Sequence, residues 1–115
     1  MIPTVLQDLF SSKAAEAVLL SLYHDGEAYG RAIARDFDIS VNAVQRQLER
    51  FERSGTIVCK RQGRTLVYTW NPKSRLARRL RDLTGIVYDG LGNRTKELLF
   101  RERRQPRAKD KPVIR

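Results

Sequence analysis

Amide and guanidinium side chains recur at helical spacing between residues 41 and 53. At 100° of rotation per residue, one side of such a helix is apolar and consists of Val41, Val44, Leu48 and Phe51. The opposite side carries small, amide and basic residues, which are Asn42, Ala43, Arg46, Arg50 and Arg53, with Gln47 at the border. Amides and guanidinium groups pair with base edges, and a small residue permits close approach. The pattern predicts a helix that reads the major groove of DNA, with its first two turns at the bases and Arg50 and Arg53 at phosphates.

A second basic group lies shortly after this helix, where Lys60, Arg61 and Arg64 surround Gln62 and Gly63. The runs 57–61 and 65–70 on either side are rich in β-branched and aromatic residues, and the glycine suits a tight turn. These features predict a β-hairpin with a basic tip. Such tips reach a minor groove or the phosphates beside the main site.

The rest of the chain supplies the elements that must position these two groups. Apolar stripes predict helices over 12–23, 30–37 and 72–88, with a short extended piece at 27–29 and a tight turn at 38–40. We expect Asn71 to cap the helix that starts at Pro72, and a further short helix over 93–104. The order helix, strand, helix, turn, helix, hairpin, helix predicts a mainly α fold with a small β-hairpin (α+β), a winged helix-turn-helix over residues 1–92.

The charge of the chain is large and uneven. The net charge is +10, yet residues 1–59 carry six basic and eight acidic groups, whereas residues 60–115 carry seventeen basic and five acidic groups. An anionic partner is expected, with double-stranded DNA ahead of RNA or an acidic membrane. Residues 105–115 are basic and poor in apolar side chains, so we expect a disordered tail. A single cysteine, with neither a signal sequence nor a membrane-length apolar run, indicates the cytoplasm.

The apolar residues of the long fourth helix and of the N-terminal arm exceed what a chain of this length is expected to bury internally. We expect a homodimer whose interface contains Leu6, Leu9, Phe10, Leu76, Leu80, Leu83 and Val87. Such a dimer would place two recognition helices about one turn of DNA apart.

Residues 9–75 resemble the ArsR-like winged helix-turn-helix domains of small transcriptional regulators. The resemblance lies in the opening LFSSKA, the segment ISVNAVQRQLERFERSG and the hairpin IVCKRQGRTLVYTWNP. It implies transcription regulation through DNA contacts from Ser40, Asn42, Ala43, Gln45, Arg46, Arg50, Arg61 and Arg64. Metal-sensing relatives use clusters of soft ligands, but Cys59 and His24 are the only ones in this chain, so we expect no metal site.

Other classes of function find less support in the residues. The chain has no phosphate-binding glycine loop, nucleophile elbow or paired-carboxylate motif, so neither enzymatic activity nor a cofactor is expected. A protein-interaction module is one alternative, although such winged helices usually lose the basic and amide side of the recognition helix. RNA binding is another, although no aromatic stacking platform is evident. The identity of any small-molecule effector stays open.

Overall fold

The computed structural model describes residues 4–104, with side chains described as far as Phe100. The expected tail at 105–115 and the first three residues lie outside the described residues. The elements, in chain order, are α1 (Val5–Phe10), α2 (Lys13–Asp25), β1 (Glu27–Ala28), α3 (Gly30–Phe37), α4 (Val41–Arg53), β2 (Ile57–Gln62), β3 (Thr65–Trp70), α5 (Arg75–Asp89) and α6 (Asn93–Arg104).

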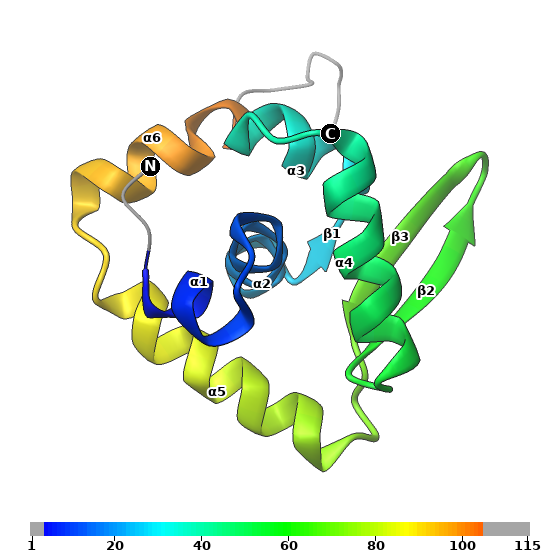
Figure 1. Cartoon of the computed structure of the whole chain (residues 1–115). Helices are drawn as coiled ribbons and strands as arrows, with labels where there is room; N and C mark the ends of the chain where they lie inside the picture. The colour runs from blue at the N-terminus through cyan, green and yellow to red at the C-terminus, as the bar shows by residue number, and fades with distance from the viewer. Residues whose placement is uncertain (1–3, 105–115) are drawn as a thin grey trace.

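Helix α2 is the centre of the fold, and the other helices surround it (Figure 1). Every residue from Ala14 to Leu22 is buried, which is the pattern of a helix with neighbours on all sides. Ser12 caps the helix, its hydroxyl accepting from the Ala15 N–H at 3.0 Å. The core that forms around α2 fixes where the peripheral helices and the sheet can lie.

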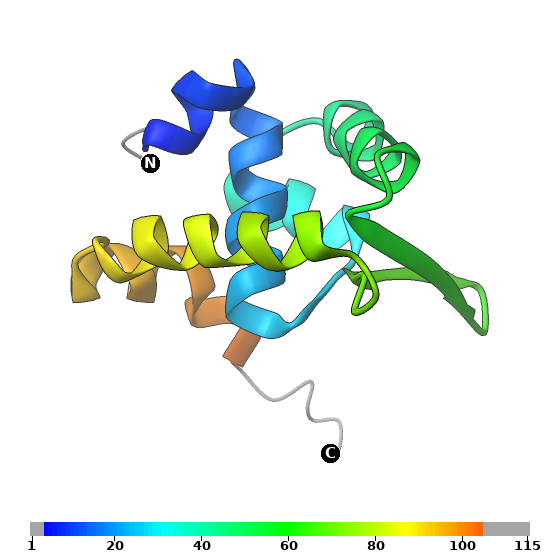
Figure 2. The ribbon, with the colours of Figure 1, turned by 90° about the horizontal axis from the view of Figure 1, so that it is seen from below.

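A small antiparallel sheet with strand order β1-β3-β2 completes the fold. Strands β2 and β3 form a hairpin in register from the pair Ile57 and Trp70 to the pair Gln62 and Thr65. Gly63 occupies the turn with φ +62°, a conformation that side chains with a Cβ rarely adopt. The hairpin extends beyond the helices as a wing (Figure 2). The architecture confirms the predicted α+β winged helix-turn-helix fold.

Helix α1 lies in the N-terminal arm, for which no helix is predicted from the sequence. Thr4 caps it, accepting from the Leu6 N–H at 3.1 Å, and Thr4 in turn donates to the buried carboxylate of Glu16 in α2. Leu6, expected at a subunit interface, is fully buried in the chain's own core because α1 packs on α2. Leu9 on the other side of α1 remains 58% exposed.

The start of α5 also differs from the prediction. Ser74, rather than Asn71, caps the helix, and its hydroxyl accepts from the Ala77 N–H at 3.0 Å. The Asn71 side chain instead donates to the Gly55 carbonyl at 2.8 Å and accepts from the Lys73 N–H at 3.0 Å. Asn71 therefore joins the end of the wing to the turn after α4, and the helix begins three residues later than expected.

Helix α6 packs back onto the core. Phe100 is buried, and its ring stacks on the His24 ring with centroids 3.9 Å apart and planes 8° apart. His24 Nδ1 lies 2.8 Å from the Tyr88 hydroxyl, so the end of α2 contacts both C-terminal helices. No helix among residues 4–104 is long and apolar enough to cross a membrane.

Candidate nucleic-acid interface

Helices α3 and α4 form the helix-turn-helix. Asp38 ends α3 in the left-handed conformation with φ +55°, and the Ile39 N–H donates back to the Ala34 carbonyl at 2.9 Å. Ser40 then caps α4, its hydroxyl accepting from the Ala43 N–H at 3.1 Å. This short turn sets the direction in which α4 leaves α3.

One side of α4 is anchored to the core, as its periodicity predicts. Val44, Leu48 and Phe51 are buried against α2 and α3. Val41, predicted on the same apolar side, is instead 46% exposed. It lines a hollow between α4 and the wing, because the core packing begins only with the next turn of the helix.

The other side of α4 presents the predicted polar residues. Asn42, Arg46, Arg50 and Arg53 are exposed, and Ala43 is half-buried among them. Since guanidinium groups carry donors for both guanine edges and phosphates, this side can bind a duplex through bases and backbone.

The two glutamines of α4 lie at its borders, and each has a partner within the protein. Gln45 Nε2 donates to the Tyr68 hydroxyl of the wing at 3.0 Å. Gln47 Oε1 accepts from Arg50 Nη1 at 3.2 Å. Burial raises the pKa of Tyr68, while the hydrogen bond from Gln45 opposes that shift, so the hydroxyl stays neutral at physiological pH. Gln45 therefore holds α4 to the sheet, a role that the sequence did not indicate.

The wing presents the second basic group. Lys60, Arg61, Gln62 and Arg64 are all exposed. Strand alternation places Arg61 opposite Leu66, on the same face of the hairpin as Tyr68, which meets α4. Lys60 pairs with Val67 and lies on the other face. The structure thus separates the basic residues, with Arg61 on the side of α4 and Lys60 away from it.

A hollow of about 420 Å³ separates α4 from the wing. Val41 and Gln45 line it from α4, and Arg64 and Leu66 line it from the hairpin. Arg31 at the start of α3 lines it as well and is exposed, although the sequence analysis did not select it. The available signal was its position in the first turn of the first helix of the motif, the helix that crosses the backbone in helix-turn-helix complexes.

The part of the chain that the structure describes contains no group of three or more His, Cys, Asp or Glu residues placed to hold a metal ion. Cys59 is half-buried in β2 and packs against the hydrophobic core.

Comparison with known proteins gives matches among solved structures. Neither family models nor curated proteins give a match. The structure of reduced AbfR bound to DNA matches with a TM-score of 0.53 and 24% sequence identity, covering 86% of this chain and 72% of that one. The structure of overoxidized AbfR bound to DNA matches with a TM-score of 0.52 and 25% identity, covering 86% and 74%. In its fold, the chain is thus similar to a protein that has been solved on DNA.

Proposed function

We propose that this chain is a transcriptional regulator that binds double-stranded DNA sequence-specifically. The observation that carries the proposal is the exposed basic and amide side of α4, with a basic wing beside it. Helix α4 enters the major groove, and the wing contacts the flanking groove or backbone. Support also comes from the similarity in fold to AbfR, which was solved bound to DNA. The role is one of binding, without catalysis.

The contacts divide by position along α4. Asn42, Ala43 and Arg46 lie in its first two turns and meet base edges, and Arg50 and Arg53 lie further along and meet phosphates. Flanking contacts come from Ser40, Gln47, Lys60, Arg61, Gln62 and Arg64, and Gln45 supports them from behind through its hydrogen bond to Tyr68. We add Arg31 to this set, because it lies on the same hollow as Arg64.

We further propose that the regulator acts as a homodimer. Ile86 of α5 is 72% exposed, and Leu9 of α1 is 58% exposed. Helices α1 and α5 contact each other, and an apolar patch formed by neighbouring elements is typical of surfaces that a partner covers. Half-buried Leu83 and Val87 of α5 would add to the interface, whereas Phe10, Leu76 and Leu80, also expected there, line a hollow between α1, α4 and α5.

The ArsR-like assignment and a cytoplasmic location belong to the same proposal, and rest on the segments and the single cysteine described above. Within the domain organisation we propose, residues 1–92 form the DNA-binding and dimerisation unit, and α6 adds a short helix that packs on its core through Phe100. Residues 105–115 add nonspecific attraction to phosphates.

The test is selection of bound fragments from genomic DNA by the purified full chain, followed by affinity measurements. Fluorescence anisotropy would compare a selected fragment, a scrambled duplex of equal length and the RNA duplex of the same sequence. We expect the selected DNA to bind at least about 10³-fold more tightly than the scrambled duplex. Equal affinity for all three would contradict sequence-specific DNA binding, and preference for the RNA would favour the RNA-binding alternative.

A further inference from the structure

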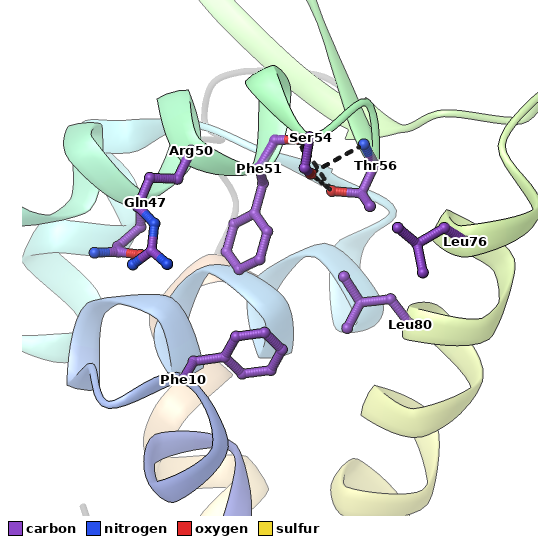
Figure 3. A pocket seen from close by; sticks show the side chains of 8 residues that line it. All are labelled: Phe10, Gln47, Arg50, Phe51, Ser54, Thr56, Leu76 and Leu80. Atoms are coloured by element: carbon purple, nitrogen blue, oxygen red, sulfur yellow. Dashed lines mark hydrogen bonds between the residues drawn. The ribbon is translucent and has the colours of Figure 1, made fainter.

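A second hollow, largely apolar, lies where α1, α4 and α5 meet (Figure 3). Its volume is about 310 Å³, at the lower end of the range for small-molecule sites. Phe10 and Phe51 line one side, with ring centroids 5.8 Å apart and planes at 70°, and Leu76 and Leu80 line the other. The lining suits a flat apolar group of one or two rings.

The polar groups of this hollow are of two kinds. The hydroxyls of Ser54 and Thr56 donate to the Phe51 carbonyl, at 2.7 Å and 3.0 Å, and are thereby satisfied. The guanidinium of Arg50 is exposed and makes one hydrogen bond to a described residue, to Gln47 Oε1. No carboxylate lines the hollow within the described chain, so its charge complements an anion rather than a cation.

We propose that this hollow binds an aromatic carboxylate, with its ring between the two phenylalanines and the two leucines and its carboxylate paired with Arg50. We propose further that its binding lowers the affinity for DNA, a coupling that rests on the proposed function. Arg50 lies on the side of α4 assigned to the duplex, and a guanidinium paired with the ligand is no longer free for a phosphate. By linkage, DNA lowers the affinity for the ligand by the same factor.

The direct test is calorimetric titration of the DNA-free full chain with 2-naphthoate. The neutral 2-naphthylmethanol and the cationic 2-naphthylmethylamine serve as analogues of similar size. We expect the alcohol to bind about tenfold more weakly than the carboxylate, because the charge-assisted pair is lost. We expect the amine to bind more weakly still. Equal binding of the three compounds would overturn the assignment of an anion site.

Two pairs of variants locate the site. Arg50→Gln should weaken 2-naphthoate binding about tenfold, whereas Arg53→Gln removes the same charge from the same helix outside the hollow and should not. Leu76→Trp should obstruct the hollow, whereas Ile86→Trp places the same ring on α5 outside it. Leu76 is exposed, so the core should tolerate the larger side chain. Equal effects of the two variants within either pair would overturn the site. An affinity for 2-naphthoate that falls as the protein concentration rises would also overturn it, because that result would assign the hollow to a dimer interface.

The coupling is tested separately with the selected DNA fragment. Saturating 2-naphthoate should weaken DNA binding about fivefold to tenfold, and the DNA should weaken 2-naphthoate binding by the same factor. Binding of 2-naphthoate with unchanged DNA affinity would overturn the coupling and retain the site. Failure of all DNA binding would overturn the proposed function, and the titrations without DNA would still decide on the site.

Discussion

Gln45 of the recognition helix donates a hydrogen bond of 3.0 Å to the hydroxyl of Tyr68 in the wing. The two residues are 23 positions apart in the chain and belong to the two elements assigned to DNA. Tyr68 is buried, so its hydroxyl has little access to water as an alternative partner. The pair therefore helps to set the position of α4 relative to the wing.

This hydrogen bond should be measurable as a coupling free energy. Tyr68→Phe and the nearly isosteric Gln45→Met should each lower the free energy of unfolding by about 0.5–1.5 kcal/mol. The double variant should lose less than the sum of the single losses, because the second change removes a group whose partner is already gone. Urea unfolding of the four proteins gives the cycle, and strictly additive losses would show that the two groups do not interact in solution.

Arg46 provides the test of base recognition. Arg46→Ala should lower affinity for the selected fragment by about 1–3 kcal/mol and relax the preference at one base position. The charge-matched control is Arg94→Ala in α6. Helix α6 and the wing lie on opposite sides of α2 (Figure 1). Anisotropy with point-substituted duplexes measures both quantities. Full retention of discrimination in Arg46→Ala would mean that another side of the domain reads the bases.

The wing arginines are expected to contact phosphates. The double variant Arg61→Ala with Arg64→Ala should weaken binding to all duplexes and reduce the slope of log affinity against log salt by about one to two units. The exposed pair Arg79 and Arg94, replaced together by alanine, controls for the loss of two positive charges. A salt slope equal to that of the control would place the wing away from DNA.

The proposed dimer is tested on residues that are exposed in one chain. Leu9→Glu with Ile86→Glu should leave the subunit folded, because neither side chain belongs to the core. The same changes would bury unpaired carboxylates at an interface and should convert dimers to monomers. Sedimentation velocity measures the state, and circular dichroism checks the fold. A wild-type chain that sediments as a monomer when free, and as one chain per duplex when bound to the selected fragment, would rule out a dimer as the binding form.

Gly85 tests the packing that positions α5. A Cβ at this residue would lie 2.8 Å from Cε1 of Tyr23, so Gly85→Ala should destabilise the fold by about 1–3 kcal/mol despite the better helix propensity of alanine. Gly92→Ala is the matched control, since a Cβ there meets nothing within 4 Å. Thermal unfolding of both variants decides the point, and equal melting temperatures would show that Tyr23 moves aside at little cost.

The features that the sequence determined on its own are those with a local period. Val44, Leu48 and Phe51 repeat at helical spacing opposite Asn42 and Arg46, so the two sides of α4 follow from the geometry of a single helix. The hairpin likewise follows from two β-rich runs around Gly63. Both signals lie within a few residues of the chain, where conformational preference and burial pattern agree.

Other features depend on which distant segment of the chain packs against a residue, and these features only the tertiary structure decided. Leu6 has the apolar character of an interface residue, but α1 folds onto α2 and buries it in the chain's own core. Gln45 has the amide of a base-reading residue, but the buried hydroxyl of Tyr68 lies beside it. Asn71 has the side chain of a cap, but the carbonyl of Gly55 lies within its reach. Each of these side chains can chemically fill more than one role, and in each case a contact between segments far apart in sequence determines which role it has. No local sequence pattern predicts where such a contact forms.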